Sequence, residues 1–113
     1  MVQHLAFRTD WISDDLRLNP NQLVVVDVAG DSMAPTLSHD DTLLVDRTKH
    51  KLSDGIYVLD INDRMMVKRI HVLADGSVRL KSDNPAYSTE DIRDQELDQL
   101  TVVGRAVWIG RRM

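Results

Sequence analysis

Ser32 and Lys68 are the two residues of this sequence whose types and surroundings point most directly to chemistry. Ser32 lies in the run GDSMAP at residues 30–35, and Lys68 lies in the run VKRI at residues 67–70. A serine hydroxyl becomes an effective nucleophile when a neighbouring base removes its proton, and a lysine acts as that base only in its uncharged form. The pair therefore predicts a serine–lysine dyad that hydrolyses peptide bonds.

Lys68 falls on an apolar face of the strand that we expect over residues 65–73. Strand alternation places it on one face together with Met66, Ile70 and Val72. Burial among apolar side chains disfavours the ammonium form and lowers the pKa of a lysine, as a lysine base requires. The alternative is a surface lysine whose stem covers apolar neighbours while its charge stays in water, which is the common situation for lysine.

Ser32 is expected just beyond the edge of a sheet. Residues 23–29 are β-branched and continuous enough for a buried strand, and Gly30 allows unusual backbone angles where that strand ends. A short turn from Ser32 to Ala34 leaves backbone N–H groups without partners, and these are suited to face a developing oxyanion. Serine is also a common capping residue, so Ser32 judged alone is more often a cap than a nucleophile.

The rest of the sequence predicts mainly β structure. Strands are expected at residues 23–29, 42–46, 56–61, 65–73, 77–82 and 101–109, with a short helix in 10–17 and a polar connection over 88–99. Asn62-Asp63 and Asp75-Gly76 are turn signals between strand-like runs. Together they predict a three-stranded meander with Lys68 in its central strand, where strand pairing holds the amine against Ser32.

Composition limits the classes of function. The chain has 113 residues, no cysteine and a formal net charge of −4. We expect one core domain over residues 23–113, preceded by a linker-derived segment over 1–22 that is too short for a helix-turn-helix. The negative charge disfavours nucleic-acid binding by this part, and without a membrane-span pattern, a signal peptide or a disulfide framework the expected compartment is the cytoplasm.

Metal and histidine chemistry are not expected. His4, His39, His50 and His71 are widely spaced, without the close pairing of metal ligands on one element, so we predict no metal and no cofactor. His71 is expected on the strand face opposite to Lys68. His39, seven residues after Ser32, leaves a histidine-based triad open as a less favoured alternative.

Six blocks of the sequence, in this order, resemble the peptidase domain of LexA-type and phage repressors, the self-cleaving serine–lysine family that also includes UmuD. The blocks are VAGDSMAPTL at 28–37, DTLLVD at 41–46, DGIYV at 54–58, VKRI at 67–70, LKSDNPAY at 80–87 and VGRAV at 103–107. The opening residues 7–12 look most like the segment that precedes this domain in phage repressors. Among these relatives, the resemblance favours a prophage repressor.

The resemblance implies a mainly β, LexA/signal-peptidase-like fold with short helical segments. It implies Ser32 as the nucleophile, Lys68 as the general base, and the backbone amides of Asp31 and Ser32 as the oxyanion hole. The supporting residues of the motif would be Gly30, Met33 and Pro35. The sequence departs from the family at Asp40, where glycine is usual, but aspartate tolerates left-handed turn geometry better than most residues.

The same resemblance implies a function and partners. Family members form homodimers, bind DNA through an N-terminal helix-turn-helix, and cleave an Ala-Gly or Cys-Gly bond of their own upstream linker when stimulated by the RecA filament during the SOS response. The only Ala-Gly bond here is Ala29-Gly30, inside the motif, so the substrate linker and the DNA-binding part are expected upstream.

Two other functions are alternatives to self-cleavage. The first is a non-catalytic dimerisation module. The second is a processing protease like the type I signal peptidases, which share similar Ser-Met-x-Pro and Lys-Arg motifs. The lack of a membrane anchor in the sequence argues against the processing protease.

Overall fold

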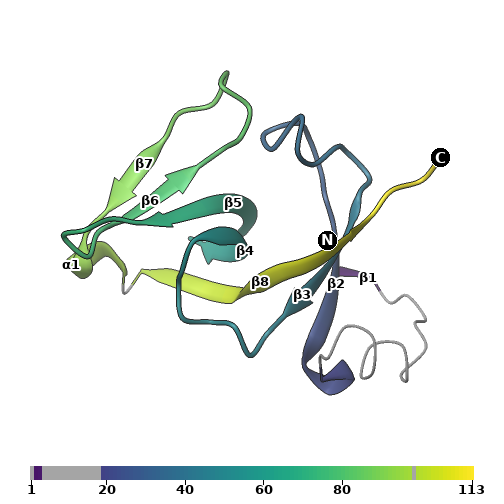
Figure 1. Ribbon diagram of the computed structural model, residues 1–113, viewed down its shortest axis with the longest axis horizontal. Coiled ribbons are helices and arrows are strands. Elements are labelled where there is room, and N and C mark those ends of the chain that lie inside the picture. The colour runs from purple at the N-terminus through teal and green to yellow at the C-terminus, as the bar shows by residue number, and fades with distance from the viewer. Residues whose placement is uncertain (1, 4–18, 98) are drawn as a thin grey trace.

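A single antiparallel sheet organises the chain. The computed structural model describes residues 2–3, 19–97 and 99–113, and the helix expected over residues 10–17 lies outside them. In this part of the chain the sheet has eight strands in the order β1-β2-β3-β8-β4-β5-β6-β7 (Figure 1). The strands are β1 Val2–Gln3, β2 Leu23–Asp27, β3 Thr42–Asp46, β4 Gly55–Ile61, β5 Arg64–Val72, β6 Val78–Lys81, β7 Glu90–Ile92 and β8 Leu100–Gly110.

The helical segments are short. A 3₁₀ turn, η2, covers Pro20–Gln22, and α1 covers Asp94–Leu97. Among the described residues, no helix has the length and apolar character needed to cross a membrane. The predicted mainly β fold with short helical segments is therefore confirmed.

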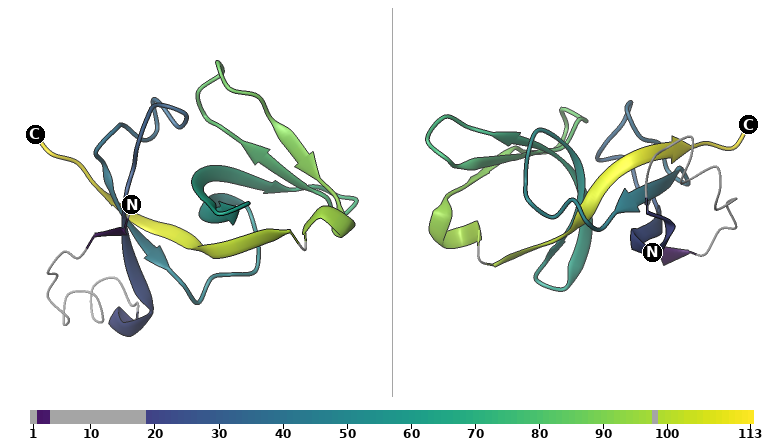
Figure 2. Two further views of the ribbon diagram at one scale, coloured as in Figure 1. Left: turned by 180° about the vertical axis from the view of Figure 1, so that it is seen from behind. Right: turned by 60° about the horizontal axis from the view of Figure 1, so that its bottom comes forward.

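Strand β8 joins the two halves of the sheet. Its residues 100–105 pair with β4, and its residues 105–110 pair with β3. Both views of Figure 2 show β2 and β3 on one side of β8 and β5, β6 and β7 on the other. Register shifts at Leu44/Val45 and at Val58/Leu59 accompany this change of partner. Such bulges increase the local twist, so one strand can serve two differently oriented groups of strands.

Two groups of buried side chains correspond to these halves. The first cluster comes from β2, β3, β4 and the loop after β2, and contains Val26, Val28, Met33, Leu37, Leu43, Val45 and Val58. The second comes from the meander, and contains Tyr57, Leu59, Ile70, Val78 and Leu80. Because the loop that carries Ser32 contributes three side chains to the first cluster, its position is coupled to the packing of the core.

The predicted meander β4-β5-β6 is confirmed. Lys68 on the central strand β5 pairs with Tyr57 on β4, and the neighbouring Arg69 pairs with Lys81 on β6. Asn62 and Asp63 both have positive φ, 52° and 63°, as a two-residue type I′ hairpin requires. Gly76, with φ 86°, closes the second hairpin.

The polar segment over 88–99 is more ordered than expected. Residues of β7 pair with β6, and α1 follows directly. The run Glu90-Asp91-Ile92 has no apolar alternation, so its pattern does not predict a strand. It is held instead by its partners, because the Arg79 guanidinium pairs with the Asp91 carboxylate at 2.9 Å and Ile92 packs against the second cluster.

Candidate functional site

The loop after β2 is a series of turns that presents Ser32. Gly30 has φ 81°, the left-handed geometry expected where the strand ends. Beyond it, the Ala34 N–H donates to the Asp31 carbonyl at 3.1 Å, and the Leu37 N–H donates to the Met33 carbonyl at 2.9 Å. Met33 is 1% exposed, whereas Ser32 is half-buried. The buried methionine therefore anchors the turn while the adjacent hydroxyl remains accessible.

Two consecutive aspartates, Asp40 and Asp41, fix the end of this loop that precedes β3. Asp40 has φ 71°, so it adopts the left-handed turn geometry that aspartate tolerates better than most residues. Asp41 is 1% exposed, and its carboxylate accepts hydrogen bonds from the Arg111 guanidinium at 2.9 and 2.8 Å. The Arg111 hydrogen bonds hold the pKa of the Asp41 carboxyl below its usual value, despite the opposing effect of burial.

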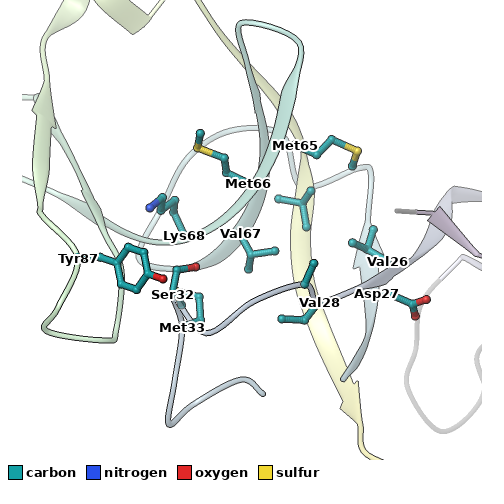
Figure 3. Close-up of a pocket in the computed structure, with 12 residues that line it drawn as sticks. Val26, Asp27, Val28, Ser32, Met33, Met65, Met66, Val67, Lys68 and Tyr87 are labelled. Atoms are coloured by element: carbon teal, nitrogen blue, oxygen red, sulfur yellow. The ribbon is translucent and has the colours of Figure 1, made fainter. Parts of the chain in front are cut away.

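Ser32 and Lys68 line the same cavity. The cavity has a volume of about 320 Å³, and Figure 3 shows Ser32 from the loop, Lys68 from β5 and Tyr87 beside one another. The remaining lining is largely apolar: Val26, Asp27, Val28, Ala29, Met33, Val58, Met65, Met66 and Val67. Two segments far apart in the sequence thus contribute the expected nucleophile and the expected base to one space.

The Lys68 side chain is half-buried and makes a short hydrogen bond. Its Nζ donates to the Ser82 Oγ at 2.6 Å, and Ser82 is 2% exposed. Met66 lines the cavity with Lys68, as strand alternation predicts, but Val67 lines it too. We attribute this departure from strict alternation to the twist of β5.

At Asp31 and Ser32, the backbone carbonyls have hydrogen-bond partners whereas the backbone N–H groups, within the described residues, have none. The Asp31 carbonyl accepts from Asn84 Nδ2 at 3.0 Å, and the Ser32 carbonyl accepts from the Asn84 N–H at 3.0 Å. Within the described residues, the N–H groups of Asp31 and Ser32 donate to no acceptor. These are the two amides expected to form an oxyanion hole, and they remain available for a ligand oxygen.

Residues 82–87 connect the loop to β5, and the sequence analysis assigned them no role. The Asp83 carboxylate accepts from the Arg69 guanidinium at 2.8 and 2.9 Å and from the Thr36 hydroxyl at 2.5 Å. The Arg69 hydrogen bonds lower the pKa of the Asp83 carboxyl. Tyr87 donates from its phenol to the Asp31 carboxylate at 2.5 Å, which raises the pKa of the phenol. The available signal was the LKSDNPAY block, whose polar residues follow a strand directly.

His39 and His71, the two histidines weighed against Lys68 as a partner of Ser32, do not line this cavity. His39 accepts the Gly30 N–H through its Nδ1 at 2.9 Å and does not line the cavity. His71 lines a separate surface hollow with Arg79 and Asp91. Among the described residues, the titratable side chains that line the cavity are therefore Asp27, Lys68 and Tyr87, and Lys68 is the one predicted as the base.

Comparison with known proteins identifies the family. Residues 2–107 match the family described as Peptidase S24-like. The chain belongs to this family. The Ser32 loop, β5 and residues 82–87 all lie inside the matched range, so the resemblance to LexA-type and phage repressors is confirmed.

Curated relatives of this peptidase S24-like chain are named as transcriptional regulators. It is 30% identical over 98 residues to the HTH-type transcriptional regulator PrtR of Pseudomonas aeruginosa, covering 80% of this chain and 37% of that protein. It is 26% identical over 106 residues to an uncharacterized HTH-type transcriptional regulator of Haemophilus influenzae, covering 93% of this chain and 44% of that protein. The chain thus spans less than half the length of either relative.

Proposed function

We propose that this chain is the autoproteolysis and dimerisation domain of a phage-type transcriptional repressor. The observation that carries the proposal is one cavity lined by both a half-buried lysine and a half-buried serine, in a chain of the peptidase S24-like family. The names of the curated relatives support the transcriptional role. From the cavity and from the names of these relatives, we also propose the activity and the partners of the whole protein.

The proposed reaction uses Ser32 as the nucleophile and Lys68 as the general base. Uncharged Lys68 takes the proton of the Ser32 hydroxyl as its oxygen attacks a peptide carbonyl. The N–H groups of Asp31 and Ser32 stabilise the resulting oxyanion. Lys68 then passes the proton to the departing amine, and water hydrolyses the acyl-enzyme ester with the same lysine as its base.

The proposed substrate is an Ala-Gly or Cys-Gly bond in a linker upstream of this chain. The apolar lining of the cavity suits a small side chain such as that of alanine. Tethering supplies an effective molarity of about 10⁵–10⁸ M when the reacting groups are well aligned, so little binding energy is needed from the cavity itself. The RecA filament is the proposed stimulus, and a separate helix-turn-helix domain is the proposed contact to DNA.

Cleavage by the dyad is tested in a fusion of this chain to an upstream linker that contains Ala-Gly. We expect Ser32→Ala to abolish cleavage and Lys68→Ala to slow it by about 10²–10⁴-fold, the usual contribution of a general base. Ser77→Ala and Lys81→Ala are the matched controls, because both residues lie outside the cavity. Cleavage of the Lys68→Ala fusion at the wild-type rate would remove lysine from the mechanism.

Dimerisation is tested separately by sedimentation equilibrium of the wild-type chain and Ser32→Ala at matched concentrations. We expect the same association constant for both, because removing one hydroxyl from the cavity leaves a dimer surface unchanged. Dimers without cleavage in the wild-type fusion would favour the non-catalytic dimerisation module. A monomer at all concentrations would contradict the dimerisation part of the proposal.

A further inference from the structure

Ser82 is a buried hydroxyl that the reaction above does not use. It is 2% exposed, it lies directly after β6, and its Oγ accepts the hydrogen bond of Lys68 Nζ at 2.6 Å. A buried hydroxyl that accepts from an amine both directs the amine and supplies part of the solvation that the amine loses on burial. Ser82 therefore hydrogen-bonds the expected base.

We propose that Ser82 is a positioning residue that holds the Lys68 amine toward the Ser32 side of the cavity. The proposal rests on the proposed function, since it assigns a role relative to the Ser32–Lys68 dyad. A lysine side chain has four rotatable carbon–carbon bonds, so a general base made of lysine needs an external contact to select one orientation. The Ser82 hydroxyl is that contact.

The segment that carries Ser82 is itself held on both sides. Next to Ser82, Asp83 pairs with Arg69 of β5 through two hydrogen bonds, at 2.8 and 2.9 Å. One residue further, Asn84 binds the Ser32 carbonyl through its N–H and the Asp31 carbonyl through its Nδ2, both at 3.0 Å. Ser82 is thereby held in register with the strand of the base and with the loop of the nucleophile. Three consecutive residues set the separation of the two catalytic groups.

The first readout is the titration of Lys68 in the chain as it stands, followed by NMR of labelled lysine side chains. The sequence has four lysines, Lys49, Lys51, Lys68 and Lys81, and Lys68→Arg identifies the signal. A hydroxyl that accepts from Nζ stabilises the ammonium more than the amine. We therefore expect Ser82→Ala to move the NMR midpoint of Lys68 to lower pH, by more than Ser77→Ala moves it.

The second readout is the pH–rate profile of the linker fusion. We expect Ser82→Ala to lower the maximal cleavage rate at alkaline pH by about 10–100-fold, because a misplaced amine costs rate even when it is uncharged. The midpoint of the profile should move in the same direction as the NMR midpoint. Ser82→Thr, which keeps the hydroxyl, should restore both.

The matched control is Ser77→Ala. Ser77 is also buried, at 5% exposure, and lies in the same hairpin, but its hydroxyl donates to Asp75 and not to the lysine. If Ser82→Ala does not fold, Ser82→Cys tests the same role, since it keeps the size of the side chain with a weaker acceptor. We expect Ser82→Cys to shift both midpoints in the same direction by a smaller amount.

Three outcomes would overturn the role of Ser82. They are wild-type midpoints in both Ser82→Ala and Ser82→Cys, an effect of Ser77→Ala equal to that of Ser82→Ala, or a lower rate with an unchanged midpoint, which indicates only a structural role. Failure of the proposed function is distinguishable from these, because it appears as full cleavage in Ser32→Ala or as no cleavage of the wild-type fusion. The NMR readout also tests the Ser82 contact without any cleavage.

Discussion

Among single residues, Lys68 is the one whose surroundings decide whether it can act as a base. The residue is half-buried, it lines the cavity together with Met66, Val67 and Met33, and it hydrogen-bonds a hydroxyl rather than a carboxylate. A carboxylate partner would favour the charged ammonium, which cannot accept a proton. A neutral partner leaves the lysine able to donate one N–H while its lone pair points elsewhere. Half-burial and a neutral hydrogen-bond partner are both compatible with a lysine base. The cleavage rate should then depend on the fraction of Lys68 that is uncharged.

Cleavage of the linker fusion should accelerate as the pH is raised through the mildly alkaline range. Only the uncharged amine can take the Ser32 proton, and its fraction rises tenfold for each pH unit while the ammonium form dominates. Initial cleavage rates measured between pH 6 and about 10 should therefore have a slope near one on a logarithmic plot, followed by a plateau. A rate that is independent of pH across this range would contradict a lysine base.

At the scale of elements, the close approach of β8 to β3 holds the two halves of the sheet together. Gly104 is buried in β8, at the point where the strand changes partner. A Cβ added at Gly104 would lie 2.4 Å from the Asp46 carbonyl oxygen, which belongs to the backbone of β3. Backbone cannot move aside as a flexible side chain can, so only glycine allows the strands to pair this closely.

Gly104→Ala is therefore expected to lower the free energy of unfolding by about 1–3 kcal/mol or more, the usual cost of overpacking a core. The measurement is urea denaturation followed by circular dichroism. Gly76→Ala is the reference for backbone strain alone, since a Cβ at Gly76 meets nothing within 4 Å and alanine there is strained only by the positive φ, so Gly104→Ala should be the less stable of the two. Equal stability of Gly104→Ala and wild type would show that β3 and β8 can separate without cost.

At the scale of the whole molecule, ion pairs connect segments distant in sequence around the cavity. Arg111, after β8, pairs with the buried Asp41, and Arg69 of β5 pairs with Asp83. Both pairs fix the Ser32 loop indirectly, because Asp41 ends that loop and Asp83 accepts from Thr36 within it. In both aspartates the arginine hydrogen bonds lower the pKa of the carboxyl. The stability of the site is thereby linked to pH.

The sign of this linkage follows from the lowered pKa values of Asp41 and Asp83. Their contribution to stability is fully present above the unfolded-state value of about 3.8 and is lost as the pH falls through the lower folded-state values. Denaturation midpoints in urea should be steady from pH 7 to 5 and fall below about pH 4. Asp83→Asn should be less stable at pH 7 and lose less on acidification.

The control for this prediction is Asp63→Asn. Asp63 is an exposed turn residue with positive φ, a geometry that asparagine also tolerates, and it has no ion-pair partner among the described residues. The acid dependence of Asp63→Asn should match that of wild type. An acid dependence of Asp83→Asn as steep as that of wild type would remove Asp83 from the linkage.

Local chemistry determined the parts of this protein that the sequence predicted. Alternating apolar residues and the Asn62-Asp63 and Asp75-Gly76 turns produce the meander with Lys68 at its centre, and Gly30 ends β2 in the expected geometry. These features depend on neighbours within a few residues, so the local sequence is enough to predict them. The mainly β class and the family resemblance depend on the same local blocks and are confirmed.

Which distant residues come together depends on the packing of the strands and cannot be inferred from the local sequence. The Ser82 contact to Lys68, the Asn84 contacts to the Ser32 loop and the edge strand β7 all depend on the register and twist of paired strands. A one-residue slip would turn each of these side chains to the other face of the sheet. In the sequence, residues 82–87 are simply polar residues that follow a strand. Their contacts with β5 on one side and with the Ser32 loop on the other bring them to the cavity.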